Sequence, residues 1–355
     1  MIRLAEVLRR HWPAYERKYR ARLLPSHRRA VAALLSCRTP VLGGQLYRCD
    51  CGQEHYAYHS CNHRACPQCG HADATEWLLR QRRKLLPVPY YLVTFTVPAQ
   101  LRQVIRSHQK ELYVLLLRES AAALRDLARD HKNLGAQLGV LTVLQTWTRD
   151  LRYHPHVHCV VPGGGLSADR LRWVRPKHAA YFLPQAALAW RFRSRLKARL
   201  QQDHPALLAQ IPPGVWGRPW VADVQPVGSG EPALKYLAAY VYRTAFSAER
   251  IVRDDAQGIT FSYRDRQAGQ TRTVCLSPGR FLHRFLQHVL PLGFQRVRAF
   301  GWLSAAAKTS WLRVCALLDW QAPAPTPPAP LPPPLCPRCH KPMHWVGRLP
   351  RAPPG

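Results

Sequence analysis

The chain has 355 residues, of which 47% are hydrophobic, so it is long enough for two or three domains with a sizeable core. Its 52 Lys and Arg outnumber its 20 Asp and Glu, giving a formal net charge of +32. This excess predicts a polyanionic partner, with nucleic acid as the first candidate, and disfavours an active site built from several carboxylates. No apolar stretch is long enough to span a membrane and the N-terminus has no apolar signal core, so we expect a cytoplasmic protein.

The spacing of apolar residues predicts helices and strands in alternation. Helical spacing occurs at residues 3–35, 73–86, 99–131, 185–203, 231–245 and 280–319. Runs of β-branched and aromatic residues predict strands at 90–98, 138–147, 155–162 and 221–227, and a β-ribbon over 258–276. The strands 138–147 and 155–162 are close enough in sequence to form a hairpin-like pair. The Pro-rich stretch 321–334 predicts an extended linker.

Cysteines concentrate between residues 36 and 72, and in a reducing compartment the 11 cysteines of the chain indicate metal binding more than disulfides. Cys66-Pro-Gln-Cys69-Gly has the form of a zinc knuckle, with two thiolates on a tight turn. A tetrahedral structural zinc site needs a second pair, and Cys49 with Cys51 is nearest. The alternatives for one member of that pair are Cys37, Cys61, His59 and His63.

A second group of metal-binding residue types lies in the C-terminal tail, "CPRCHKPMHW". It contains Cys336, Cys339, His340 and His344. The two cysteines supply at least half of a zinc site, and whether the tail holds a complete site stays open.

The strand "YHPHVHCVVP" carries His156 and His158 two residues apart. Alternate residues of a strand share a face, so both imidazoles point the same way while Val157 points into the core. Two neutral imidazoles form one edge of a metal site, although a pair of surface histidines gives the same pattern. This spacing also occurs in metallohydrolase barrels and cupins, so it does not by itself select a chemistry.

A predicted helix, "LKYLAAYVYRTAF", carries Tyr236 and Tyr240 one turn apart on one face. Such pairs usually belong to a core. Beside a divalent ion and a phosphodiester, however, a phenol is a nucleophile that forms a 5′-phosphotyrosine and frees a 3′-hydroxyl. The ester conserves the bond energy, so no nucleotide cofactor is expected, and the chain has no GxxxxGK[ST] loop.

The stretch "YHPHVHCVVPGGGL" resembles the HUH motif of HUH endonucleases, and over roughly residues 20–320 the chain resembles the IS91/ISCR family of transposases. The other stretches that carry the resemblance are "SCNHRACPQCG", "YYLVTFTVP", "KYLAAYVYRTAFSAERI" and "QRVRAFGWLSAAAK". The resemblance implies an α+β fold, with an antiparallel, ferredoxin-like HUH core between a helical and zinc-binding N-terminal region and a helical C-terminal region. It implies six segments: 1–35 helical, 36–86 zinc- and DNA-binding, 87–277 catalytic, 278–320 helical, 321–335 linker and 336–355 tail.

For function, the resemblance implies rolling-circle-like transposition of single-stranded DNA in a bacterial nucleoid. Tyr236 and Tyr240 match the tyrosine positions of the family, and His156 and His158 would hold Mg²⁺ or Mn²⁺. Gln145 stands where the family often has His, so its carbonyl oxygen is a candidate third ligand.

The partner expected is DNA at single-stranded element ends, and a second copy of the chain is a further candidate. Expected DNA contacts are Arg191, Arg193, Arg195, Lys197, Lys235 and Arg243, with exposed aromatics such as Trp147 or Trp173. Two other functions fit the motifs. A plasmid replication initiator or relaxase shares the chemistry, whereas a non-catalytic zinc-containing DNA-binding protein is disfavoured by the intact His–His–Tyr set.

Overall fold

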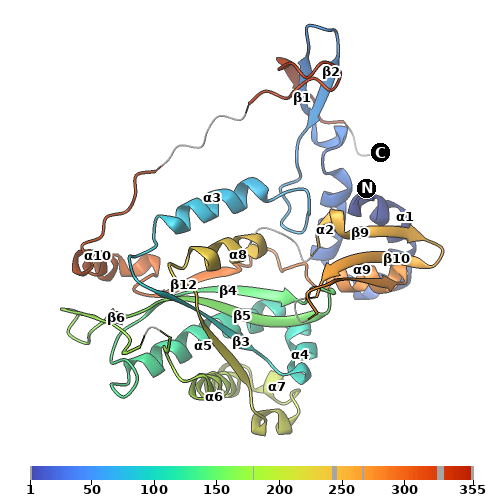
Figure 1. Cartoon of the computed structure of the whole chain (residues 1–355). Helices are drawn as coiled ribbons and strands as arrows, with labels where there is room; N and C mark the ends of the chain where they lie inside the picture. Colours follow the sequence, from blue (N-terminus) through green and yellow to red (C-terminus); the bar gives the residue numbers. More distant parts are fainter. Residues whose placement is uncertain (1, 179, 242–245, 266–267, 326–331, 353–355) are drawn as a thin grey trace. The chain divides into compact units, whose positions relative to one another are not determined.

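The chain forms two compact units, each built from separated stretches of sequence. In this computed structural model the described residues are 2–178, 180–241, 246–265, 268–325 and 332–352 (Figure 1). The first unit comprises Met1–Asp73, Tyr242–Val289 and Ala324–Gly355, and the second comprises Ala74–Val241 and Leu290–Pro323. The segments expected from sequence followed chain order and did not anticipate this grouping. Among the described residues, no helix has the length and apolar character needed to cross a membrane.

The second unit is organised around a five-stranded antiparallel sheet with the strand order β12-β4-β5-β3-β8. Its strands are β3 (Tyr90–Thr96), β4 (Gly139–Trp147), β5 (Tyr153–Pro162), β8 (Val221–Pro226) and β12 (Val297–Gly301). Four of them confirm the strands predicted from β-branched and aromatic runs. β4 and β5 pair directly, as their short connection predicted. The fold is therefore α+β with antiparallel sheets.

The strand β12 corrects the prediction of a continuous helix over residues 280–319. The structure instead has helix α9 (Pro278–Leu286), then β12, then helix α10 (Lys308–Leu317). Gly301 ends the strand at φ 64°, where a Cβ atom would overlap the carbonyl oxygen of Leu138. Only glycine fits this close approach of two backbones, and β12 gains its hydrogen bonds from the edge of β4, a tertiary partner that local spacing does not reveal.

Helices cover both faces of this sheet. Figure 1 shows α5 (Gln109–Arg129) and α6 (Gln185–Asp203) on one side and α8 (Glu231–Val241) on the other. The main apolar core lies between the sheet and α5 with α6, where the rings of Phe95 and Phe192 are 4.9 Å apart. The remaining elements of the unit are α3 (His71–Arg82), α4 (Arg102–Ser107), α7 (Pro205–Leu208), β6 (Gly165–Leu166) and β7 (Trp173–Val174).

The first unit contains two three-stranded antiparallel sheets and helices α1 (Leu4–Tyr19), α2 (Pro25–Ser36) and α9. One sheet consists of β9 (Ile251–Asp255), β10 (Gly258–Arg264) and β11 (Thr271–Leu276). The pair β10–β11 confirms the β-ribbon predicted over 258–276, whereas β9 was not predicted. The other has the order β13-β1-β2 and consists of β1 (Gly44–Arg48), β2 (Glu54–Tyr58) and β13 (His344–Leu349). In Figure 1 the C-terminal segment, drawn in red, lies along the β1–β2 hairpin.

Candidate functional site

A row of polar side chains crosses the face of the five-stranded sheet that does not contribute to the main core. His158 on β5 pairs with Thr94 on β3, and His156 pairs with Gln145 on β4. Directly paired residues project from the same face, so these four side chains gather on one side of the sheet. Val157, between the two histidines, is only 1% exposed and belongs to the core. The predicted alternation of this strand is therefore confirmed.

Both ring nitrogens of His158 have polar neighbours. Nδ1 lies 3.0 Å from the hydroxyl oxygen of Thr94, and Nε2 lies 3.1 Å from Oε1 of Gln145. The amide nitrogen of Gln145 donates to the carbonyl oxygen of Trp147, which turns Oε1 toward the histidine. A cation at Nε2 requires the ring proton on Nδ1, where Thr94 can accept it. Sequence reasoning missed Thr94, although its place in the alternating run "YYLVTFTVP" was the available signal.

His156 presents a neutral imidazole on the same face. Its Nδ1 lies 2.7 Å from the carbonyl oxygen of His154, a distance at which it donates a hydrogen bond and leaves the lone pair on Nε2. Burial away from water lowers the pKa of His156 to about 4, so the ring is uncharged near neutral pH. The ring centroids of His156 and His158 are 4.8 Å apart. Two adjacent rings of this kind suit a metal ion better than two imidazolium groups would.

Tyr236 approaches this pair from helix α8. Leu234, Leu237 and Ala238 form the buried stripe of the helix, and Tyr236 lies outside that stripe and is partly exposed. Its ring meets the ring of His158 edge to face, with the centroids 5.8 Å apart. Tyr236 is thus not a core aromatic.

Two sequence-predicted residues of this region cannot be placed. Tyr240 follows Tyr236 by one helical turn, and its side chain is not described. Arg243 lies outside the described residues. The structure therefore brings Tyr236, His156, His158 and Gln145 together and leaves the contribution of the second tyrosine a prediction.

The basic residues expected to contact DNA have varied surroundings. Arg195 on α6 bonds the carboxylates of Glu119 and Asp126 at 2.9 and 2.6 Å, so a contact with DNA would require breaking two ion pairs. Lys197 is exposed, and Lys235 on α8 pairs with Glu231 at 2.9 Å. The other two predicted contacts on α6 also have neighbours within the chain: Arg193 donates to the carbonyl oxygen of Arg218, and Arg191 stacks over Trp190.

Helix α6 and the histidines lie on opposite faces of the sheet. Phe192 of α6 packs on Phe95, whereas Thr94, the neighbour of Phe95 in β3, points toward His158. The cations of α6 therefore do not lie beside the histidines and Tyr236. The expectation that Trp147 is exposed was wrong, because its side chain is 5% exposed and lies under the guanidinium of Arg296.

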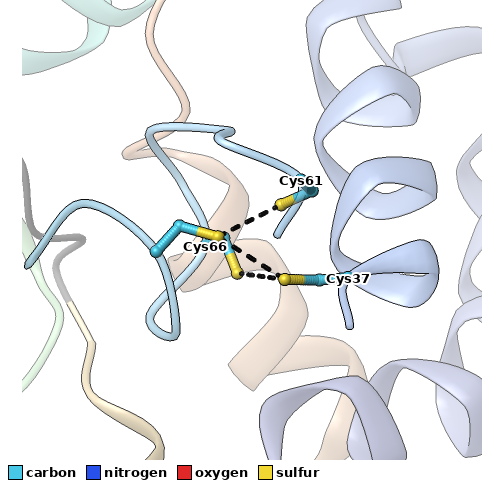
Figure 2. A group of neighbouring side chains, drawn as sticks. Cys37, Cys61 and Cys66 are labelled. Carbon is cyan, nitrogen blue, oxygen red and sulfur yellow. Dashed lines mark hydrogen bonds between the residues drawn. The ribbon is translucent and has the colours of Figure 1, made fainter. Parts of the chain in front are cut away.

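Four cysteines of the first unit converge on one point, and we call them the first cysteine cluster. They are Cys37, Cys61, Cys66 and Cys69, and their sulfur atoms all lie within 4.8 Å of one another. Cys37 follows the end of α2, and the other three lie in the loop between β2 and α3. Figure 2 shows the side chains of Cys37, Cys61 and Cys66 turned toward one another.

The spacing of these sulfur atoms fits a zinc ion. The sulfur atoms of Cys37 and Cys69 are 3.5 Å apart, and those of Cys66 and Cys37 are 3.6 Å apart. Four thiolates about 2.3 Å from a tetrahedral zinc ion are about 3.8 Å apart, whereas bonded sulfurs are about 2.05 Å apart. The donor set and its geometry therefore support structural Zn²⁺ bound by four cysteines.

The pKa values of two thiols in this cluster shift in opposite directions. Hydrogen bonds from the Cys66 thiol and the His63 amide lower the pKa of Cys61 to about 5, although burial opposes this shift. Burial raises the pKa of Cys37 to about 12. Zinc binding would displace the thiol protons of the cluster.

This grouping contains the predicted Cys66 and Cys69 together with both cysteine alternatives, Cys37 and Cys61, in place of the expected pair Cys49 and Cys51. Cys49 and Cys51 do not join Cys66 and Cys69, because they lie at the turn between β1 and β2, whose five-residue strands carry them about 17 Å along the hairpin. The return of the chain along β2 instead brings Cys61 beside Cys37, with the amide of Arg38 bonded to the carbonyl oxygen of His59. Neither His59 nor His63 is among the four ligands.

Comparison with known proteins identifies two regions of the chain. Residues 7–97 match the family described as a transposase zinc-binding domain, and residues 139–310 match one described as a putative transposase. A putative transposase of Sinorhizobium fredii, y4qJ, is 34% identical over 91% of this chain and 86% of its own length. The transposase for insertion sequence element IS801 of Pseudomonas savastanoi pv. phaseolicola is 27% identical over 84% of this chain and 75% of its own length. No solved structure matches the chain.

Proposed function

Because the chain belongs to the IS91 family of transposases, we propose that it nicks and rejoins single-stranded DNA at the ends of an insertion sequence. The reaction is rolling-circle-like DNA transposition through a covalent 5′-phosphotyrosine. The observation that carries this proposal is the position of the Tyr236 ring beside His158, on the same sheet face as His156 and Gln145.

The five-stranded sheet is the HUH core of this proposal. β5, which carries both histidines, is its central strand, so the histidines have ordered neighbours on either side. Nε2 of His156, Nε2 of His158 and Oε1 of Gln145 are the donors for Mg²⁺ or Mn²⁺. When bound, the ion would neutralise charge on the scissile phosphate.

The residues of the chain supply the covalent step. The phenol oxygen of Tyr236 attacks the phosphorus and loses its proton, the bond from phosphorus to the 3′ oxygen breaks, and the 3′ oxygen takes up a proton. Thr94 holds the ring of His158 in the required tautomer. In the reverse step a 3′-hydroxyl attacks the phosphotyrosine and frees Tyr236. Tyr240, one turn away, is the candidate nucleophile for a second ester.

The net charge of +32 supports an electrostatic contribution to DNA binding. Affinity for single strands should therefore fall steeply as salt concentration rises. A weak salt dependence, or a preference for duplex DNA without hairpins, would argue against this part of the proposal.

The decisive experiment mixes the full chain with end-labelled single strands carrying the element ends, in Mg²⁺ or Mn²⁺, and detects covalent adducts on denaturing gels. Tyr236→Phe should abolish the adduct and retain DNA binding, because only the nucleophilic oxygen is removed. Tyr240→Phe is the matched variant: if it still nicks but no longer completes strand transfer, two tyrosines act in turn. An adduct mapped by mass spectrometry to a residue other than these two would refute the assignment.

A further inference from the structure

The C-terminal tail brings two cysteines to the tip of the β1–β2 hairpin, and we call the four residues the second cysteine cluster. They are Cys49, Cys51, Cys336 and Cys339, whose sulfur atoms all lie within 4.8 Å of one another. The sulfur–sulfur distances are 3.4 Å for Cys49–Cys339, 3.6 Å for Cys51–Cys336 and 3.7 Å for Cys339–Cys51. These values approach the edges of about 3.8 Å expected around zinc and are far from a disulfide bond.

Two tight turns hold these sulfurs from opposite sides. At the hairpin, the amide of Gly52 donates to the carbonyl oxygen of Cys49 at 2.8 Å, and Gly52 has φ 83°. In the tail, the amide of His340 donates to the carbonyl oxygen of Cys336 at 2.9 Å. The amides of Arg338 and Cys339 also bond the sulfur of Cys336. At the hairpin, the amide of Cys51 likewise bonds the sulfur of Cys49, so each turn is a knuckle that places backbone amides beside a cysteine sulfur.

The surroundings of the cluster are also built from both ends of the sequence. Strand β13, directly after the tail knuckle, pairs with β1 over Gly44–Arg48. Cys336 is fully buried, Cys49 is 3% exposed, and Met343 at 2% packs with them in a small apolar group. Two knuckles joined by a three-stranded sheet bring four sulfur donors together, with Cys49 and Cys336 buried, Cys339 partly buried and Cys51 exposed. Four converging sulfur donors are the setting of a structural zinc ion.

We propose that the second cysteine cluster binds a second structural Zn²⁺, with two ligands from the hairpin and two from the tail. The site fastens the C-terminal tail to the N-terminal hairpin. The tail cysteines lie outside both regions matched by family models, 7–97 and 139–310. His340 and His344, which would complete a site within the tail alone, are both exposed, and His344 instead lies 3.3 Å from Asp50.

Zinc content of the purified full chain tests whether the four ligands share one ion. The Cys51→Ser and Cys339→Ser variants should each lose one zinc relative to the unchanged protein. The double variant Cys51→Ser/Cys339→Ser should also lose only one, because both residues serve the same ion. Cys66→Ser/Cys339→Ser should lose two, because its substitutions fall in different clusters. Cys275→Ser, an exposed cysteine outside both clusters, is the control and should lose none.

Histidine variants and circular dichroism complete the test. His340→Ala/His344→Ala should retain all zinc, and the dichroism signal of the helices should be unchanged in every variant of the second cluster. Loss of zinc in the histidine variant together with full retention in Cys51→Ser would show that the tail closes its own site. Full zinc retention in Cys339→Ser, or loss of two ions in Cys51→Ser/Cys339→Ser, would equally overturn the proposal.

Discussion

The first cysteine cluster and the histidine site on the sheet (His156, His158 and Gln145, with Tyr236) differ in the donor atoms that they offer to a metal ion. The cluster offers four sulfur donors, enough to enclose zinc with protein ligands alone. The histidine site offers two ring nitrogens and one amide oxygen, beside a phenol that is partly exposed. A closed donor set stabilises a fold, whereas an incomplete set leaves room for a substrate. The comparison predicts that substitutions in the two places produce separable losses.

The largest effect is expected at the first cysteine cluster. Cys66→Ser should remove one zinc per chain and unfold the cysteine-rich region, because structural zinc contributes about 10 kcal/mol or more to such sites. Metal analysis and limited proteolysis would measure both consequences. A Cys66→Ser protein that is free of this zinc but still resists proteolysis would contradict the structural role.

His158→Ala should reduce DNA cleavage and leave the zinc-bound cysteine cluster intact. Cleavage of single-stranded DNA should fall more than about a hundredfold, since a direct ligand matters more than the outer groups whose loss costs about 10- to 100-fold. Zinc content and resistance to proteolysis should stay unchanged. Loss of zinc together with activity in this variant would contradict the prediction that the two sites are independent.

Thr94 tests how far the histidine site depends on its supporting hydrogen bond. Thr94→Val keeps the shape but cannot accept the proton of His158 Nδ1, so cleavage should fall about 10- to 100-fold and require more metal ion. Thr94→Ser restores a hydroxyl and should restore most of the activity and the metal requirement. Equal losses in the two variants would point to packing rather than to the hydrogen bond.

The smallest effect is expected from a comparison of two knuckles, Cys66–Cys69 in the first cluster and Cys336–Cys339 in the tail. The residue after the second cysteine is Gly70 at φ 80° in one and His340 at φ 58° in the other. His340→Gly should stabilise the tail knuckle by about 0.5–1 kcal/mol, whereas Gly70→Ala should destabilise its own by at least as much. Thermal unfolding with zinc present would measure the opposite signs. Shifts in the same direction would show that backbone strain is not the controlling factor.

Local sequence patterns predicted four strands of the large sheet and the common face of His156 and His158. They did so because the alternation of a strand depends only on residues that are adjacent in sequence. These patterns failed for elements whose pairing partners are distant in sequence. β12 depends on the edge of β4, and its own five residues have too little pattern to separate them from the flanking helices. The β-ribbon 258–276 succeeded because its two strands are neighbours in sequence.

The grouping of cysteines failed for the same reason. Spacing identified Cys66 and Cys69 as a knuckle, but the second pair depends on where the β1–β2 hairpin carries Cys49 and Cys51. Their neighbour Cys339 is 290 residues from Cys49 along the chain. Thr94 was missed because a hydroxyl on a strand has many ordinary roles, and only its distance from His158 gives it significance.

The pairing of β13 with β1 has a consequence for biosynthesis. At about 5–20 residues per second, a ribosome reaches Cys339 about 15 to 60 seconds after Cys49. Throughout that interval β1 has only β2 as a strand neighbour, and Cys49 and Cys51 lack the tail cysteines. A chain truncated by a premature stop codon or a cleaved mRNA lacks β13, so its N-terminal sheet lacks one strand. We therefore expect proteases to cleave such a truncated chain at its N-terminal sheet, although that part of the protein was synthesised first.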